Sequence, residues 1–244
     1  QANDFRHLAE HHDCEMQMGG SDQWGNITAG IDLIRKRLGR SAYGLTWPLV
    51  TRADGTKFGK TESGTVWLDS SMTSPYAFYQ FWLNVEDADV VDRLKVFTFL
   101  TRAEIDALAA QTADTPHLRA AQKCLAFEVT ALVHSPEAAQ AAVDASAALF
   151  GQGDLEALDA ATLESALREL PNADAAPETA IAQLLLDTGL VASVSAGRRA
   201  IAEGGVYLNN VKVDDEAALA GAWLHGKFAV LRRGKKTLAG LFRA

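Results

Sequence analysis

The sequence has few cysteines and lacks long apolar runs. Cys14 and Cys124 are two cysteines among 244 residues and lie far apart, which argues against a disulfide framework and favours a reducing, cytoplasmic compartment. No uninterrupted apolar stretch is long enough to span a bilayer, and no secretory signal opens the chain. The sequence therefore predicts no membrane partner. A composition of 48% hydrophobic and 22% charged residues is that of an ordinary soluble globular protein.

The sequence also lacks an initiator methionine. It begins Gln-Ala-Asn-Asp and runs directly into residues with a helical pattern. We therefore expect the chain to be part of a longer polypeptide. Its 244 residues suffice for one large domain or for two to three smaller ones.

Residues 54–61, Asp-Gly-Thr-Lys-Phe-Gly-Lys-Thr, predict a loop rich in glycine and lysine. Lys57 and Lys60 lie three residues apart, and Gly55 and Gly59 permit close backbone approach. The loop can thus bring two ammonium groups and several backbone N–H donors onto one polyphosphate. Its spacing differs from the phosphate-binding loop that ends in Gly-Lys-Ser/Thr. A solvated surface turn is the alternative interpretation of these residues alone.

Residues 14–50 alternate between strand and helix patterns. Residues 14–18 alternate like a strand, a helix of about a dozen residues follows and ends at Gly39, and residues 45–50 predict a second buried strand. This second strand leads into the lysine loop. The succession of strand, glycine turn, helix and strand is typical of an α/β sheet.

The glycine turn, Gly19-Gly-Ser-Asp-Gln-Trp-Gly-Asn26, lies between the first predicted strand and the helix. In an open α/β sheet, ligands bind at this end of the strands. Gly20 lets backbone donors reach a ligand, Asp22 can accept from ribose hydroxyls, and Gln23 offers both a donor and an acceptor. In the alternative interpretation Asp22 only caps the helix.

The chain divides by pattern into four parts. A capping box, Thr101-x-x-Glu104, and apolar residues at helical spacing predict helices in the second part. Hairpins about Asn209-Asn210 and Gly234 predict a compact unit at the end. The fold class is therefore α/β, followed by α, followed by α+β. The predicted boundaries are 1–74 for the α/β part, 75–150 for a helical domain, 151–177 for a linker and 178–244 for the compact unit.

Basic residues gather in the last part of the chain. Residues 178–244 contain nine Lys/Arg against six Asp/Glu, a net charge of +3, whereas the remainder has 14 against 25, a net charge of −11. A polyanionic partner is expected to meet the basic part. A solvated face is the alternative. Residues that could form a phosphate-binding face are Arg198, Arg199, Lys212, Arg232, Arg233, Lys235 and Lys236.

A competing motif lies near the start of the chain. His7-Leu-Ala-Glu-His11 matches His-x-x-Glu-His, the inverted zinc-protease pattern. Two imidazoles one helical turn apart can ligate zinc, and Glu10 could act as a general base. No third ligand is evident in the sequence, so a solvated amphipathic helix is favoured and no residue is assigned to a metal.

The glycine turn and the lysine loop together resemble bacterial tyrosyl-tRNA synthetases, which are class I aminoacyl-tRNA synthetases. Residues 57–61 are similar to the Lys-Met-Ser-Lys-Ser motif of that class in its Lys-Phe-Gly-Lys-Thr form, and residues 67–69 and 74–82 continue the likeness. Residues 178–244 resemble the S4-type RNA-binding domain that ends such enzymes. The resemblance covers essentially the whole chain. It implies that residues 1–74 are the second half of a Rossmann-like catalytic domain and that residues 75–150 help to seat tRNA.

The resemblance assigns three residues to tyrosine. Gln1 corresponds to a glutamine near the amino end of the bound amino acid, Asp4 to the aspartate that hydrogen-bonds the phenolic hydroxyl, and Gln23 to a residue at the amino-acid part of the adenylate. A polar partner for the hydroxyl excludes phenylalanine, because phenylalanine would leave that partner without a hydrogen bond. Tyrosyl-tRNA synthetases are the standard example of this effect. Local sequence alone favours Asp4 as a helix cap.

The resemblance implies that the glycine turn and the lysine loop both bind the nucleotide. Gly20 and Asp22 match residues at ATP or the adenylate, with Asp22 on the ribose. Lys57, Lys60 and Thr61 match the mobile catalytic loop, with Lys60 as the usual ATP contact. Lysines on a mobile loop stabilise the charge of the departing pyrophosphate as it develops.

The activity implied by the resemblance is tyrosine–tRNA ligation. The partners implied are tyrosine, tRNA(Tyr), ATP as a substrate with Mg, and a second copy in a homodimer, without a tightly bound cofactor and without DNA. The other motif of the class, His-Ile-Gly-His or a close variant, is absent from the 244 residues. We therefore expect this chain alone to be inactive. A non-catalytic RNA-binding protein remains an alternative, and a zinc hydrolase using His7 and His11 is disfavoured. The S4-like tail and the glycine turn argue against a tryptophan enzyme of the same class.

Overall fold

The computed structural model describes residues 1–51, 60–61, 64–215, 220–235 and 237–244. The described residues form two compact units, Gln1–Lys60 and Thr61–Ala244. Within the described ranges, no helix is both long and apolar enough to cross a bilayer.

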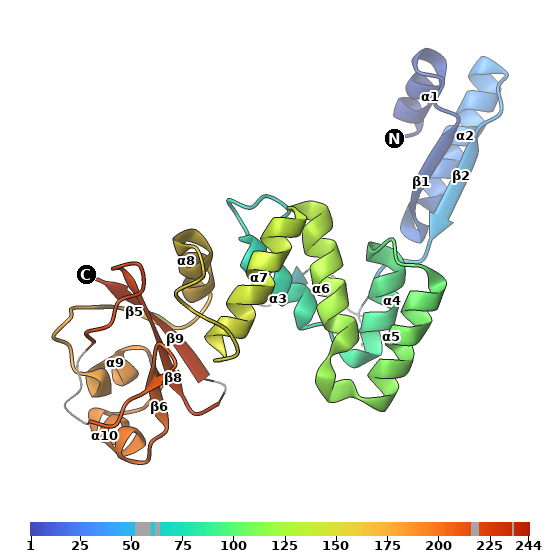
Figure 1. The fold of residues 1–244 in the computed structure, drawn as a ribbon. Helices are drawn as coiled ribbons and strands as arrows, with labels where there is room; N and C mark the ends of the chain where they lie inside the picture. Colours follow the sequence, from blue (N-terminus) through green and yellow to red (C-terminus); the bar gives the residue numbers. More distant parts are fainter. Residues whose placement is uncertain (52–59, 62–63, 216–219, 236) are drawn as a thin grey trace. The chain divides into compact units, whose positions relative to one another are not determined.

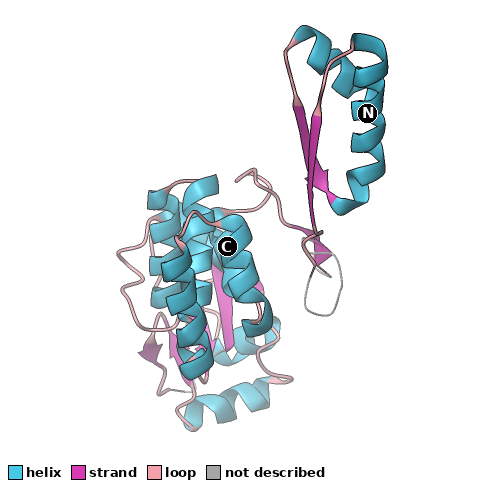
Figure 2. Ribbon diagram, turned by 90° about the vertical axis from the view of Figure 1, so that its right-hand side faces the viewer, coloured by secondary structure: helices cyan, strands magenta, loops and turns pink. Residues whose placement is uncertain are grey.

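In the first unit the second helix packs on one side of a parallel strand pair, and the first helix packs on the second (Figures 1 and 2). Gly30 lets the first helix approach the second closely, because a Cβ at this position would lie 2.8 Å from Cδ1 of Phe5. Phe5 and Ile34 are buried between the helices. The predicted order of strand, turn, helix and strand is confirmed. Its elements are α1 (Ala2–His11), β1 (Met16–Gly20), η1 (Ser21–Gln23), α2 (Trp24–Leu38) and β2 (Tyr43–Trp47).

A short strand pair follows, whose first residue, Lys60, ends the first unit. The second unit continues with a group of helices, as the sequence predicts for residues 75–150. Buried aromatic side chains of α3 form much of the core, with Trp82 in a tilted contact with Phe97 of α4 at 4.9 Å between ring centroids. Thr101 and Glu104 form the predicted capping box at the start of α5. The elements are β3 (Lys60–Thr61), β4 (Gly64–Thr65), α3 (Pro75–Leu83), α4 (Asp87–Phe97), α5 (Arg102–Asp114), η2 (Pro116–Leu118), α6 (Ala120–Val133) and α7 (Pro136–Leu149).

The chain ends in a sheet with helices on both faces. The strand order is β5-β9-β8-β6-β7, with β5 parallel to β9 and the other neighbours antiparallel. Asn209 and Asn210 form the predicted turn between β6 and β7, with φ of 48° and 66°. The elements are α8 (Ala160–Arg168), β5 (Asn172–Ala175), α9 (Ile181–Asp187), α10 (Val194–Ala202), β6 (Val206–Leu208), β7 (Val211–Lys212), β8 (Phe228–Arg233) and β9 (Thr237–Arg243).

The segment 151–177, for which the sequence predicts a linker, contains regular structure. Leu163 and Leu167 of α8 are buried, and β5 pairs with β9 from Asn172 opposite Gly240 onward. The close approach of the two segments requires a glycine at position 240, because a Cβ there would lie 2.8 Å from the carbonyl oxygen of Leu167. The segment is therefore packed against the terminal sheet.

Candidate functional site

The carboxyl ends of β1 and β2 lie at one edge of the parallel pair. Gly20, the last residue of β1, is opposite Trp47, the last residue of β2. The turn η1 and the N-terminus of α2 follow β1 at this edge, and the segment toward the lysine loop follows β2. Two motifs that are separate in the sequence thus begin side by side, at the edge where α/β sheets bind ligands.

Gly20 is tightly enclosed at this edge. A Cβ at Gly20 would lie 2.7 Å from Oδ1 of Asp22 and 3.0 Å from Cδ2 of Leu49. The carboxylate of the turn and the segment after β2 therefore both occupy the space that a side chain at Gly20 would need. Any side chain at this position would displace one or both of them.

Hydrogen bonds link the polar side chains of the turn. Asn26 Nδ2 donates to Gln23 Oε1 at 3.0 Å, and Gln23 Nε2 donates to Asp22 Oδ2 at 3.2 Å. Asp22 does not cap the helix, since the N-cap of α2 is Gln23, without a side-chain cap bond. The alternative interpretation of Asp22 as a cap is thus wrong. Its carboxylate is exposed and oriented by a neighbouring amide, which suits an acceptor for a ligand's hydroxyl groups.

Gln1 and Asp4 lie at the start of α1. Phe5 packs near Gly30, and Arg40, beyond the end of α2, donates through Nη1 to the carbonyl oxygen of Ala9 at 2.6 Å. The two helices therefore run in the same direction. The start of α1 thus lies at the same end of the helix pair as the start of α2, which follows the glycine turn (Figure 1). Gln1 and Asp4 are both exposed.

The lysine loop is described only in part. Lys57 lies outside the described residues. Lys60 and Thr61 form β3, which pairs with β4.

One face of the parallel pair is apolar and exposed. Met16 and Met18 of β1 lie opposite Tyr43 and Leu45 of β2, and all four side chains are exposed. The helices cover the other face (Figure 2). In unit Gln1–Lys60 by itself, the sheet is thus covered on one side.

The predicted RNA-binding residues fall into two groups, on opposite faces of the terminal sheet. Arg232 lies opposite Tyr207, which lies opposite Lys212, so these three share a face. Arg233 is on the other face, where its Nη1 donates to the carbonyl oxygen of Leu190 at 2.7 Å.

The second group lies beside α10. Arg233 lines a cavity of about 250 Å³ together with Ala200 and Glu203 of that helix. Arg198 and Arg199 of α10 are exposed, as is Lys235 in the turn between β8 and β9, whereas Lys236 lies outside the described residues. The α10 side of the sheet thus carries Arg198, Arg199 and Arg233, and Lys235 follows in the turn after Arg233.

Lys212 and Arg232 already have partners within the protein. Lys212 Nζ lies 2.8 Å from Asp214 Oδ1, and the hydrogen bond and charge of that carboxylate raise the pKa of Lys212. The guanidinium of Arg232 stacks over the ring of Tyr207 at 4.1 Å from its centroid. Both side chains are therefore less available to an RNA phosphate than the exposed side chains of Arg198 and Arg199.

The two histidines of the His-x-x-Glu-His pattern are adjacent on α1. The ring centroids of His7 and His11 are 4.4 Å apart, and both side chains are exposed. Among the residues that the structure describes, no three His, Cys, Asp or Glu side chains are grouped so as to hold a metal ion. Nothing beyond the pair supports zinc chemistry here.

Two residues of the turn site are not predicted from the sequence. Asn26 begins the hydrogen-bond chain that reaches Asp22, and Leu49 encloses Gly20. Asn26 belongs to the glycine-turn motif itself, three residues after Gln23 at the start of a helix, and this spacing was the available signal.

Curated relatives match nearly the whole chain. The tyrosine–tRNA ligase of Kineococcus radiotolerans is 58% identical over 99% of this chain and 58% of its own length. The tyrosine–tRNA ligase of Leifsonia xyli subsp. xyli is 56% identical over 99% of this chain and 55% of its own length. The chain thus spans somewhat more than half the length of the curated relatives it matches. Among solved structures, a C-terminally truncated mitochondrial tyrosyl-tRNA synthetase of Coccidioides posadasii is 37% identical with a TM-score of 0.50, covering 58% of this chain and 41% of that one.

Two family descriptions match successive parts of the chain. Residues 162–239 match the tyrosine–tRNA ligase SYY-like C-terminal domain, which begins within α8. Residues 1–151, more than half of the chain, match the class I tRNA synthetases for tryptophan and tyrosine. The chain therefore belongs to the class I tRNA synthetases of the tryptophan and tyrosine type.

Proposed function

We propose that these residues are part of a tyrosine–tRNA ligase, which activates tyrosine with ATP and transfers the tyrosyl group to the 3′ end of tRNA(Tyr). The observation that carries the proposal is the enclosure of Gly20 by Asp22 and Leu49. It supports a single ATP site formed by the glycine turn and the lysine loop. The names and family of the relatives favour tyrosine as the amino acid.

Activation needs no protein nucleophile. The carboxylate of tyrosine attacks the α-phosphorus of ATP, the bond to the bridging oxygen breaks, and pyrophosphate leaves. The protein lowers the barrier by positioning the reactants and by stabilising charge on the leaving group. We assign Asp22 to the ribose hydroxyls, the backbone of Gly20 to the nucleotide, and Lys57, Lys60 and Thr61 to the leaving pyrophosphate. Mg enters with ATP as part of the substrate.

We assign the amino-acid pocket to the start of α1 and to Gln23. The pocket is supported by the shared direction of the two helices, since the start of α1 and the start of α2 then lie at the same end of the helix pair. In this proposal Gln1 and Gln23 hold the amino-acid part, and Asp4 accepts from the phenolic hydroxyl. A phenylalanine bound there would leave the carboxylate without its partner.

We assign tRNA to the helices and the terminal sheet. In this proposal residues 75–150 seat the tRNA and residues 178–244 act as an S4-like RNA-binding domain. The exposed Arg198 and Arg199, with Arg233 and Lys235 nearby, form the phosphate-binding surface. The ion pair of Lys212 and the stacking of Arg232 make these two residues secondary contacts.

The finer parts of the fold and assembly belong to the same proposal. Residues 1–74 would be the second half of a Rossmann-like catalytic domain, and the protein would act as a homodimer in the cytoplasm. The 244 residues lack His-Ile-Gly-His or a close variant. We therefore propose that they do not activate tyrosine by themselves, and tyrosine-dependent ATP–pyrophosphate exchange by the isolated chain above background would disprove this.

The test is ATP–pyrophosphate exchange by the full-length protein with tyrosine, tryptophan and phenylalanine in turn. We expect exchange with tyrosine and at most a trace with the other two. Preference for tryptophan would identify the other enzyme of this family. Binding of tRNA without exchange for any of the three would identify a non-catalytic RNA-binding protein.

A further inference from the structure

We propose that Asn210 is a positioning residue that fastens the terminal sheet to the end of α7 and thereby sets how tRNA meets both parts. Asn210 lies in the β6–β7 turn, and its Nδ2 donates to the carbonyl oxygen of Ala148 at 2.8 Å. The two residues are 62 positions apart in the sequence. The proposal rests on the function proposed above, in which the helices and the sheet bind one tRNA.

Ala148 lies in the last turn of α7, which ends at Leu149. The last four carbonyls of a helix have no partner within it and need donors from elsewhere. The N–H of Gly151 donates to the oxygen of Ala148 at 3.0 Å, and Asn210 supplies a second donor from the sheet. The turn thus contributes to closing the last turn of α7.

The conformation of Asn210 separates its role in the turn from its role in this contact. Its φ of 66° lies in the left-handed region, which glycine adopts most easily. Glycine would therefore satisfy the turn without a side chain. The asparagine adds an amide, and that amide reaches α7.

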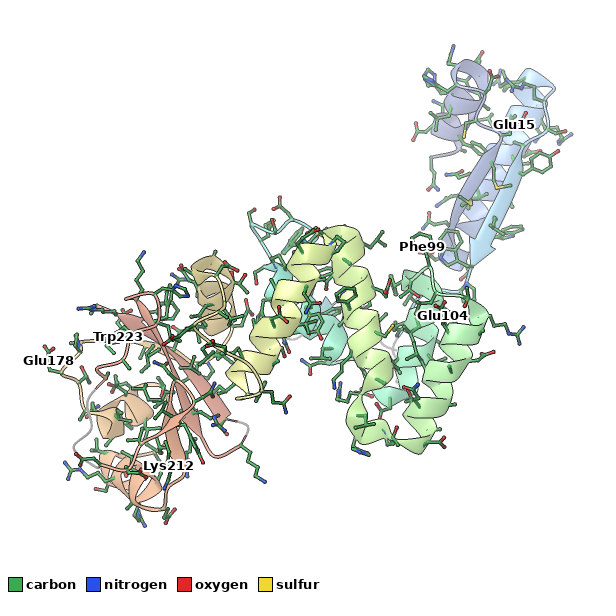
Figure 3. All side chains as sticks on the ribbon, in the orientation of Figure 1. Glu15, Phe99, Glu104, Glu178, Lys212 and Trp223 are labelled. Carbon is green, nitrogen blue, oxygen red and sulfur yellow. The ribbon has the colours of Figure 1, made fainter. Side chains whose placement is uncertain are left out.

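One further contact ties the sheet to the segment that follows α7. His225 Nε2 lies 2.8 Å from the carbonyl oxygen of Leu158. Gly151, with a φ of +77°, lies between these two contacts in the sequence, and a Cβ there would be 3.5 Å from Oδ1 of Asn210. Asn210 and His225 come from different parts of the sheet unit, and both contact carbonyl oxygens within residues 148–158. Lys212, labelled in Figure 3, lies on β7, the edge strand that pairs with β6.

A rigid connection between the terminal sheet and α7 affects tRNA binding because it sets the spacing of the two binding surfaces. When two surfaces bind the same ligand, the second contact is intramolecular, and its strength depends on how well the link holds the surfaces at the right spacing. Loosening this connection should therefore weaken tRNA binding. It should leave tyrosine activation unchanged, because the glycine turn belongs to unit Gln1–Lys60, which these contacts do not involve.

The test is Asn210→Gly in the full-length protein, with Asn209→Gly as the matched control. Asn209 has a φ of 48° in the same turn, but its side chain bonds within the sheet unit, to Ala222 at 2.9 Å and to Val230 at 2.8 Å. For Asn210→Gly we expect the KM for tRNA to rise about fivefold, the effect of one lost hydrogen bond. We expect unchanged ATP–pyrophosphate exchange and faster hydrogen exchange in residues 148–158.

An unchanged KM for tRNA in Asn210→Gly would overturn the proposal, as would an equal rise in Asn209→Gly. His225→Asn, which keeps a residue tolerant of positive φ but shortens the side chain, should reproduce the effect of Asn210→Gly in the same direction. An unchanged KM for tRNA in His225→Asn would show that the contact of His225 with Leu158 does not help to hold the sheet on α7, and would leave only the contact of Asn210. Failure of the RNA-binding role itself is recognised separately, by an unchanged KM for tRNA in the Arg198→Ala, Arg199→Ala double variant.

Discussion

The carboxylate of Asp22 lies against the backbone of Gly20, so closely that a Cβ at position 20 would be 2.7 Å from Oδ1. Gly20 ends β1 and Asp22 lies in η1, so the contact fixes the carboxylate relative to the sheet edge. The glycine is therefore required by the placement of a functional side chain and by the neighbouring Leu49. Its own φ of −66° is open to any residue.

Replacing Gly20 with Ala in the full-length protein should slow tyrosine activation. The methyl group displaces Asp22 or Leu49, and a displacement of about 1 Å in a positioning group can cost up to about 100-fold in rate. ATP–pyrophosphate exchange measures the effect. The matched control is Gly25→Ala, since a Cβ at Gly25 meets nothing within 4 Å. Equal exchange rates in the two variants would contradict the role given to Gly20.

Replacing Gly30 with Ala should destabilise the packing of α1 on α2. Alanine usually stabilises a helix by up to about 1 kcal/mol relative to glycine. Here the added Cβ would lie 2.8 Å from Phe5, and overpacking of this kind costs about 1–3 kcal/mol. Hydrogen exchange of the α1 amides should become faster in Gly30→Ala and stay unchanged or slow in Gly25→Ala. Equal protection in both variants would exclude the close contact.

Burial of Tyr76 makes the helical part sensitive to alkaline pH. Loss of solvation on burial, with a smaller contribution from the charge of Glu169, raises the pKa of Tyr76 to about 12. The folded state thus favours the neutral phenol. This contribution is complete below pH 10, the approximate pKa in the unfolded chain, and is lost as the pH rises from about 10 to 12.

The measurement is urea unfolding at pH 8, 10 and 11.5. The contribution of Tyr76 to the free energy of unfolding should fall by about 2 kcal/mol across this range, and Tyr76→Phe should remove that part of the fall. Tyr43→Phe, on the exposed face of β2, is the control and should leave the fall in the free energy of unfolding unchanged. The same pH dependence in Tyr76→Phe as in the unaltered protein would refute the assignment.

The capping box of α5 gives a prediction on helix stability. The side chain of Thr101 accepts from the backbone N–H of Glu104, and Glu104 accepts from the backbone N–H of Thr101. Thr101→Ala should lower the free energy of unfolding by about 1 kcal/mol. Thr115→Ala is the control, because Thr115 follows the C-terminus of the same helix. A larger effect at Thr115 would contradict the capping role of Thr101.

The features predicted correctly from the sequence are those fixed by local chemistry. Gly39 ends α2 with a φ of 64°, as a glycine after a helix commonly does. The Asn209-Asn210 pair forms a turn that needs positive φ at both positions. In each case a residue type with a rare conformational preference stands where the chain must adopt that conformation.

The features missed depend on contacts distant in the sequence. The strand Asn172–Ala175 consists of Asn, Ala and Asp, which have low β propensity, and its pairing with β9 comes from residues near the C-terminus. The charge pattern alone predicts Arg232 and Arg233 on one surface, whereas the alternation of a strand puts neighbours on opposite faces. The sequence predicts Asn210 as a turn residue, but its bond to Ala148 depends on how the sheet packs against α7.

The most direct test of the account is the rate of tyrosyl-adenylate formation in Lys60→Ala of the full-length protein, measured together with the Kd for tyrosine. If the lysine loop stabilises departing pyrophosphate, the rate should fall by about 100-fold or more while the Kd stays within about twofold. An unchanged rate of adenylate formation would contradict the assignment of the loop, and with it the ATP site proposed at the edge of β1 and β2.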